Sequence, residues 1–270
     1  MTGMKIHGFQ WVIGASILLW ACGDGTPDTG EMVTIPAGTY TIGVDGGAED
    51  EGPAHAVTLA AFEIDVHEVT NADFRKFVSS DDCPGPLVEG NPDPCVYDGY
   101  ESSNTHEDYW TNRDYDDYPV INVRWDQAEA YCRWLGKRLP TEAEWEVAAR
   151  GSDDRRYPWG DDEPTCDRVN YSACIPDAIE TGSLPAGASP FGALDMSGNV
   201  AEWVQDYYNP SYYSWGETDN PTGPDQGSNR VVRGGSWFCD TSKVTVTSRD
   251  QGDPLLQYSD IGFRCARSVE

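Results

Sequence analysis

Glycine and proline interrupt this chain along its whole length, with 28 glycines and 18 prolines among its 270 residues. Together they exceed the share of about 12% that is usual for proteins. Both residue types break helices, whereas a helical bundle or a coiled coil needs long uninterrupted periodic stretches. The sequence therefore predicts a loop-rich fold and excludes both helical architectures. Its 10 tryptophans and 14 tyrosines provide the large apolar surfaces that a folded core requires.

The charge balance is strongly acidic. Asp and Glu total 46 against 18 Lys and Arg, which gives a formal net charge of −28. A nucleic-acid partner would bring its phosphates toward a surface of the same sign. The sequence therefore predicts no nucleic-acid partner.

The N-terminal segment has the features of an export signal. Its apolar run over residues 11–21 is shorter than the roughly 20 residues that a bilayer span needs. Small Ala21 precedes Cys22, and a Gly, Asp, Thr and Pro tract follows over residues 23–30. This pattern resembles a bacterial lipoprotein signal, which predicts a signal peptide over 1–21, a lipidated Cys22, a flexible tether over 22–30 and a folded domain over 31–270. The alternative is an ordinary secretory leader in which Cys22 has no role.

Short strands and one short helix are expected in the first part of the domain. Two strands joined by a Pro/Gly turn are predicted over residues 32–43, followed by strands at 56–59 and 61–64. Thr70 offers an N-cap for a helix over 71–79. The polar, aperiodic stretch 80–117 is predicted to be a long loop or an insertion.

The middle of the chain carries two further helix signals around a tight turn. Asp126 is predicted to cap a helix that runs to Leu135, where Gly136 ends it. Thr141 and Glu144 have the spacing of a capping box for a second helix that ends at Gly151. The remaining residues show strand and loop signals. The expected fold class is therefore an irregular α+β domain.

Export would place the cysteines in an oxidising compartment, where they tend to pair. Seven remain besides Cys22, so at least one thiol has no partner within the chain. Cys83 and Cys95 bracket one short loop and Cys166 and Cys174 another, which makes two local bridges candidates. The sequence spacing alone leaves the connectivity open.

Two acidic, turn-rich segments are candidates for calcium sites, because calcium takes six to eight oxygen ligands from carboxylates and turn carbonyls. Asp195 and Glu202 flank a Gly-containing turn. Asn170 and Tyr171, with nearby Asp177, form the second candidate. The alternative for both segments is a set of solvated carboxylates and turn caps. The histidines outside the leader are widely spaced, which argues against a histidine-based zinc or iron site.

Cys239 follows a diglycine turn at Gly234 and Gly235 among aromatic neighbours. A reactive thiol needs access and a stabilised thiolate, whereas a structural thiol needs neither. The sequence around Cys239 leaves both interpretations open.

Five short motifs in order resemble the sulfatase-modifying factor family, whose founding activity is that of the formylglycine-generating enzyme. The matching stretches are 136–146, 157–160, 196–203, 233–237 and 261–265. The resemblance covers the chain from about Met32 to its C-terminus. It implies a single irregular domain related to C-type lectins.

The resemblance also implies ligands and a bridge. Calcium would be bound by the Asp195 and Glu202 side chains with the Gly198 and Val200 carbonyls, and a second calcium would lie near Asn170 and Tyr171. Cys132 and Cys265 match positions that form a family disulfide.

The catalytic motif of the family is only partly present. Active members oxidise a sulfatase cysteine to formylglycine with O₂ and a copper(I) ion held by two thiolates five residues apart. Cys239 occupies the first thiolate position and Ser236 that of a serine beside the oxygen pocket, but the second thiolate position is Val244. Valine supplies no donor to a soft cuprous ion. The histidine cluster of the related iron-dependent sulfoxide synthases is also missing.

The sequence therefore favours a monomeric, calcium-stabilised lipoprotein of the cell envelope, bound to the membrane only through its N-terminal lipid. Its family groove would bind a peptide, protein or glycan and would have lost efficient copper chemistry. The alternative is a working oxidase in which another group completes the copper site. A structural role in the envelope is a third interpretation.

Overall fold

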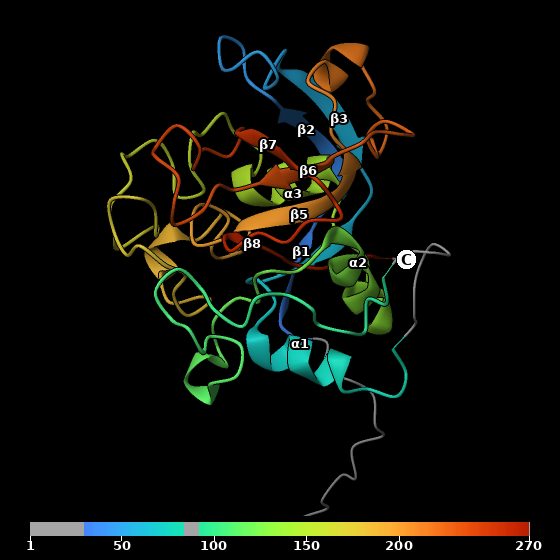
Figure 1. The fold of residues 1–270 in the computed structure, drawn as a ribbon. Coiled ribbons are helices and arrows are strands. Elements are labelled where there is room, and N and C mark those ends of the chain that lie inside the picture. The colour runs from blue at the N-terminus through green and yellow to red at the C-terminus, as the bar shows by residue number, and fades with distance from the viewer. Residues whose placement is uncertain (1–29, 84–91, 270) are drawn as a thin grey trace, which may run out of the picture.

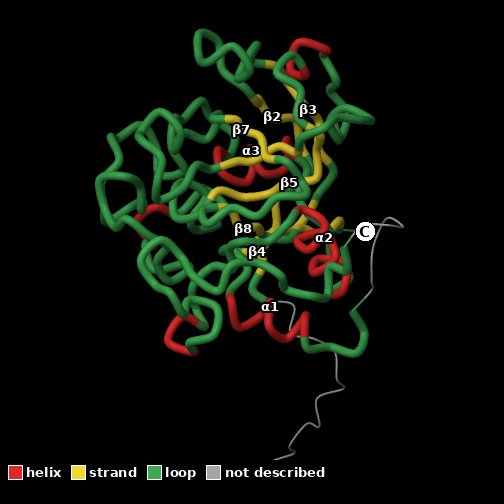
Figure 2. Tube along the Cα trace, viewed as in Figure 1, coloured by secondary structure: helices red, strands yellow, loops and turns green. Residues whose placement is uncertain are grey.

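The computed structural model describes residues 30–83 and 92–269. The predicted signal peptide, most of the tether and Cys22 lie outside these residues. The helices are α1 (Asn71–Val78), α2 (Trp125–Trp134) and α3 (Glu142–Arg150), and short 3₁₀ turns span Arg113–Tyr115, Pro185–Gly187 and Tyr212–Trp215. The strands are β1 (Met32–Ile35), β2 (Gly38–Ile42), β3 (His55–Leu59), β4 (Phe62–Asp65), β5 (Ala201–Tyr207), β6 (Arg230–Arg233), β7 (Arg249–Gly252), β8 (Ile261–Phe263) and β9 (Ala266–Ser268). Figure 2 shows that loops connect them over long stretches, as the irregular α+β prediction requires.

The strands form three small sheets. The central sheet has the order β7-β6-β5-β8, in which β5 runs parallel to β8 and antiparallel to β6. A second sheet has the order β1-β4-β9, and β2 pairs with β3 in a third. The β4–β9 pairing joins the two ends of the domain, because Phe62 lies opposite Ser268.

Two apolar clusters lie on opposite faces of the central sheet. Val204 of β5 and Val231 of β6 pack with α3 on one side, whereas Trp203 and Val232 pack with α1 and α2 on the other. Alternate residues of a strand point to opposite faces, so each strand contributes to both clusters. In Figure 1, α3 lies behind the sheet, and α1 and α2 lie below it. The core is thus divided by a sheet that is buried on both faces.

The predicted helices are present, with one correction. Thr70 caps α1 by accepting from the Asp73 amide, and Thr141 and Glu144 form the expected capping box of α3. The first residue of α2 is Trp125, so the prediction that Asp126 is its N-cap was wrong. The Asp126 carboxylate instead accepts from the Arg124 guanidinium at 3.0 Å, and the Gln127 side chain accepts from the Arg124 amide.

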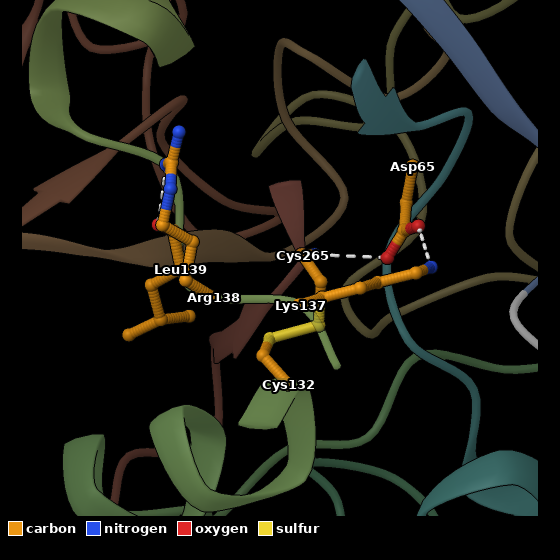
Figure 3. Close-up of a disulfide and its surroundings, with 6 residues drawn as sticks. All are labelled: Asp65, Cys132, Lys137, Arg138, Leu139 and Cys265. Atoms are coloured by element: carbon orange, nitrogen blue, oxygen red, sulfur yellow. Dashed lines mark hydrogen bonds and ion pairs between the residues drawn. A yellow bond between two sulfur atoms is a disulfide. The ribbon is translucent and has the colours of Figure 1, made fainter. Parts of the chain in front are cut away.

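The cysteine predictions are confirmed for the described residues. The structure contains the disulfides Cys83–Cys95, Cys166–Cys174 and Cys132–Cys265, and Cys239 is the free cysteine of the described chain. The Cys132–Cys265 bridge ties α2 to the segment after β8, beside a buried ion pair between Lys137 and Asp65 (Figure 3). These bridges are typical of proteins from oxidising compartments. No helix among the described residues has the length and apolar character for crossing a bilayer.

Candidate functional site

The diglycine turn after β6 positions Ser236 and Cys239. Gly235 has a φ of +66°, and a Cβ at this position would lie 2.6 Å from the Lys243 carbonyl oxygen. Only glycine fits this left-handed, crowded position without strain. The Cys239 amide donates to the Ser236 carbonyl at 2.9 Å, which closes the turn and holds the two side chains on one side.

Cys239 lines a cavity of about 190 Å³ at the central sheet, and Ser236 lies buried beside Cys239. The Ser236 hydroxyl donates to the Asp260 carboxylate at 2.8 Å and lies 3.5 Å from the Cys239 sulfur. Burial raises the pKa of the Asp260 carboxyl above its ordinary value. The cavity lining consists of Ala201, Val232, Gly235, Cys239, Lys243, Ser248, Asp250, Gln251, Tyr258, Asp260 and Ile261. The two predicted catalytic residues are thus brought together, next to Asp260, to which no sequence motif pointed.

Val244 lies on the inner side of the same loop and is fully buried. It packs with Tyr157 and Val169, and the partly buried Cys239 packs against this cluster. The position of the second thiolate is therefore next to Cys239 but carries an aliphatic side chain in a dry environment. A soft cuprous ion would find one sulfur donor here. The residues present do not fit the family's copper site.

Bends over residues 196–200 separate Asp195 from Glu202, and the Glu202 carboxylate is already occupied by hydrogen bonds from the protein. Both of its oxygens accept from the Arg264 guanidinium at 2.7 to 3.0 Å, and Oε2 also accepts from the Trp145 indole at 2.9 Å. Asp195 is buried and accepts from the Gly182 amide. The Glu202 carboxylate thus pairs with Arg264 and Trp145, whereas the Asp195 carboxylate accepts from a backbone amide.

Glu68 adds a third buried carboxylate to this region. Its Oε1 accepts from the Asn199 side chain at 3.0 Å, whereas its Oε2 is buried without a hydrogen-bond partner. Burial and then the charge of Asp195 raise the pKa of Glu68 well above its ordinary value. A buried carboxylate oxygen without a donor is costly unless a cation satisfies it. A cation next to Glu68 and Asp195 is compatible with this donor set. No motif in the sequence pointed to Glu68.

In the second calcium candidate, hydrogen bonds within the protein hold Asn170 and Asp177 in place. The Asn170 side chain donates to the Asp177 carbonyl at 2.7 Å. The Asp177 carboxylate accepts from Ser103, from the amide and hydroxyl of Thr105 and from the Ala178 amide. Tyr171 packs at the edge of the cluster that contains Val244. Asp177 therefore holds the loop over residues 103–105 by hydrogen bonds. Both calcium assignments stay predictions.

The two candidate segments are nevertheless in direct contact. The Asn199 amide donates to the Asn170 carbonyl at 2.8 Å, and a Cβ on Gly198 would lie 2.3 Å from the same oxygen. Among the described residues, no three His, Cys, Asp or Glu side chains form a metal-binding group. Any calcium here would thus need main-chain carbonyls, such as those of Gly198 and Val200, in addition to side chains.

Comparison with known proteins identifies the family. Residues 23–269 match the sulfatase-modifying factor enzyme 1-like domain. The formylglycine-generating enzyme of Mus musculus is 36% identical over 87% of this chain and 74% of the mouse protein. The inactive C-alpha-formylglycine-generating enzyme 2 of the same species is 34% identical over 88% of this chain and 86% of that protein.

A solved structure agrees with the sequence matches. PvdO from Pseudomonas aeruginosa is 26% identical and superposes with a TM-score of 0.71 over 89% of this chain and 95% of that chain. A match over nearly the whole chain, at sequence and structure level, exceeds what a shared motif would give. The chain therefore belongs to the family of the formylglycine-generating enzymes.

Proposed function

We propose that this protein no longer carries out copper-dependent oxidation and uses the cavity beside Cys239 to bind a peptide or protein partner. The observation that carries this proposal is Val244, a fully buried aliphatic residue that packs where the second thiolate would be needed. Cuprous ions bind tightly to paired thiolates, and one thiol next to a valine is a poor site. The mouse relative described as inactive supports the loss of activity within the family.

The surroundings of the cavity support a peptide or protein ligand. Phe238, next to Cys239, is 72% exposed. Leu255 and Leu256 are 57% and 53% exposed on the loop between the lining residues Gln251 and Tyr258. Exposed apolar side chains around a cavity are typical of surfaces that bind a partner. A glycan ligand would depend less on such aliphatic side chains.

A second candidate function is formylglycine generation itself, because Cys239 and Ser236 are retained and a 36% identical relative has that name. The test is to incubate the mature domain with copper(I), O₂ and a Cys-x-Pro-x-Arg peptide, and to look for the aldehyde by mass spectrometry. We expect no conversion beyond a control without protein. Conversion over many turnovers would overturn the proposal in favour of the oxidase.

Val244→Cys provides a matched test of the metal argument. Under reducing conditions, we expect this variant to bind one equivalent of copper(I) in competition with a chelator, whereas the wild type does not. Val246→Cys is the control, because Val246 is equally buried but belongs to the cluster on the α3 side. Tight wild-type binding that Cys239→Ser abolishes would show that another group completes the site.

Binding of the partner is tested separately. An array of peptides and glycans is probed with the wild-type domain and with Phe238→Ser, with and without a calcium chelator. We expect capture of peptides that is weakened by the substitution. Selective glycan capture, or no capture at all, would contradict the peptide proposal and favour a glycan-binding or structural role.

We also propose that calcium binds at the turn that contains Asp195. The unpartnered Glu68 oxygen and the excess of carboxylates over Arg264 support a cation there. Added calcium is expected to raise the melting temperature, because a ligand of the native state stabilises it. Glu68→Gln is expected to reduce this rise more than Asp177→Asn. A melting temperature that does not respond to calcium or to a chelator would contradict the assignment.

Export and lipid attachment complete the proposal. The three disulfides support an oxidising compartment. If Cys22 carries the lipid, Cys22→Ser is expected to move the protein from the membrane fraction to the supernatant. An unchanged distribution would favour the ordinary secretory leader.

A further inference from the structure

A second, larger cavity lies next to the one beside Cys239. Its volume is about 490 Å³. It is lined by the loop after β2, by the end of α3 with the segment that follows it, and by the turns over residues 242–247 that lead to β7. The lining residues are Val44, Asp45, Gly46, Gly47, Ala48, Glu51, Arg150, Asp154, Arg155, Arg156, Ser242, Lys243, Thr245 and Thr247. Lys243 borders both cavities, so the two adjoin at its side chain.

The lining of this cavity has an unusual charge for this protein. It contains four cationic side chains, Arg150, Arg155, Arg156 and Lys243, against three carboxylates, Asp45, Glu51 and Asp154. In the whole chain, Asp and Glu outnumber Lys and Arg by 46 to 18. A local excess of positive charge in such an acidic protein needs a physical reason.

Two of these arginines are used by the fold. Arg150 donates to the Gly43 carbonyl at 2.7 Å, and Arg155 donates to the Asp153 carboxylate at 2.6 Å and to the Pro158 carbonyl at 2.9 Å. All three acids are used as well, and Asp154 accepts from the Arg150 guanidinium at 3.3 Å. Asp45 accepts from the Ala54 amide at 3.1 Å, and Glu51 accepts from the Thr247 hydroxyl at 3.2 Å.

Arg156 and Lys243 differ from these residues. Arg156 lies 3.8 Å from the Glu163 carboxylate and Lys243 lies 3.7 Å from that of Asp250, the two longest ion pairs among the described residues. Both distances exceed hydrogen-bond range, and the Lys243 ammonium makes one long hydrogen bond, to the Arg249 carbonyl at 3.5 Å. The two side chains are 52% and 47% exposed. Their positive charges are therefore available to a ligand in the cavity.

The surroundings of these two cations suit an oxyanion. The Arg156 guanidinium lies 5.1 Å from the centre of the Tyr157 ring, which limits its movement. Thr245 and Ser242 bring hydroxyl groups to the same lining. Carboxylate, sulfate and phosphate groups accept charge-assisted hydrogen bonds from guanidinium and ammonium groups, and hydroxyls complete such sites.

We propose that this cavity binds an oxyanion, a carboxylate, sulfate or phosphate group, between Arg156 and Lys243. The site is assigned independently of the copper argument. Lys243 lines both cavities, so a ligand that occupies both would place its acidic group near Lys243. Because the protein as a whole repels anions, saturable binding of an anion would identify a local site and not a general attraction.

The test is a calorimetric and NMR titration of the mature domain with inorganic sulfate, inorganic phosphate and acetate, at ionic strength held constant with chloride. We expect saturable binding to one site by at least one of the three anions. Arg156→Gln and Lys243→Gln are each expected to weaken it about tenfold or more, because each removes a charge-assisted hydrogen bond. Comparison of the three anions distinguishes a carboxylate site from a site for tetrahedral anions.

Arg113→Gln is the matched control, because Arg113 is 69% exposed and lies outside the lining. It is expected to bind the anion as the wild type does. Equal weakening in Arg113→Gln, unchanged binding in Arg156→Gln, or no saturable binding by any of the three anions would overturn the proposal. Loss of anion binding with peptide capture intact would separate this site from the proposed function.

Discussion

Two regions of this molecule use the same residue types in opposite ways. The frame consists of β5 to β8 with α2 and α3, and the cavity wall consists of residues 153–174 and 234–248. In the frame, Arg249 makes two hydrogen bonds to Glu142 at 2.6 and 2.8 Å with both side chains buried. In the wall, Arg156 and Lys243 lie half exposed at 3.7 to 3.8 Å from their nearest carboxylates. Two half-exposed cations whose nearest carboxylates lie beyond hydrogen-bond range, in contrast to the closely paired Arg249, are what a ligand site would require.

The frame network joins several buried charges, although the Nε of Arg233 is buried without a hydrogen-bond partner. Arg233 donates to Glu142 at 3.1 Å and to Glu146 at 2.7 Å, and Glu146 also accepts from the Tyr213 hydroxyl and the Gly43 amide. Buried ion pairs are tolerated when additional hydrogen bonds occupy the remaining oxygens. This network joins α3 to β6, β7 and the loop after β2, so it holds the elements against which the cavities are formed.

The largest effect that separates frame from wall is expected from the disulfides. Cys132–Cys265 closes 133 residues and Cys166–Cys174 closes 8. In the loop-entropy model, these bridges contribute about 5 and about 2.5 kcal/mol. Replacing each pair by alanine and measuring urea unfolding should show a clearly greater loss for the first pair. Equal losses would mean that residual structure in the unfolded chain, or strain, outweighs loop length.

Breaking the frame network is expected to cost nearly as much. Arg249→Met leaves the Glu142 carboxylate buried without its main partner, which typically destabilises by about 3–5 kcal/mol. Arg267→Met is the control, because Arg267 pairs with Glu63 at the surface and is 44% exposed. An exposed pair is worth about 1 kcal/mol or less. Urea unfolding of both variants tests the difference, and similar losses would show that the buried network is not special.

The pH dependence of stability is expected to distinguish the frame from the wall by a smaller amount. Burial raises the pKa of Asp206 in β5 well above its ordinary value, whereas a hydrogen bond with the Thr165 side chain lowers the pKa of Asp167 in the wall. A raised carboxyl pKa stabilises the native state at low pH, and this stability is lost as the pH rises through the native pKa. A lowered pKa acts in the opposite direction, with stability lost on acidification.

The wild type should therefore lose stability relative to Asp206→Asn as the pH rises above the ordinary pKa of about 4 towards the raised native pKa. Relative to Asp167→Asn, it should lose stability as the pH falls below about 4. Urea unfolding of the three proteins across this range provides the measurement. Parallel profiles for wild type and Asp206→Asn would show that water or a neighbouring group relieves the burial of Asp206.

The features that could be predicted from the sequence are those marked by residues close together in the chain or by a family motif. The Thr141–Glu144 capping box needs only residues three apart, and the Cys132–Cys265 bridge came with the family resemblance. The parts it did not predict depend on contacts between distant segments. Glu142 and Arg249 are 107 residues apart, and Asp260 reaches Ser236 across 24. Acidic residues are so common in this chain that no spacing singled out Glu68 or Asp260.

The wrong prediction of Asp126 as the N-cap of α2 also results from contacts that the local sequence does not reveal. Asp126 has the residue type that favours N-caps, but a buried Arg124 two residues earlier takes its carboxylate and Asp98 as partners. The local preference of Asp126 is overridden because a buried guanidinium without an acid would cost more than a missing cap. Pairing of a buried arginine with acids thus determines where α2 begins, as it determines which groups contact Glu202 in the candidate calcium site.

The smallest effect is the one that separates the wall cations from the frame. Arg156→Gln and Lys243→Gln are each expected to change the free energy of unfolding by less than about 0.5 kcal/mol, as is usual for half-exposed surface positions. Urea unfolding without added sulfate or phosphate measures this change. A loss above about 1.5 kcal/mol would place these residues with the frame as structural charges. If stability is unchanged and anion binding is lost, their positive charge has no structural role that explains it, and a ligand is the remaining reason for keeping two cations at one cavity of so acidic a protein.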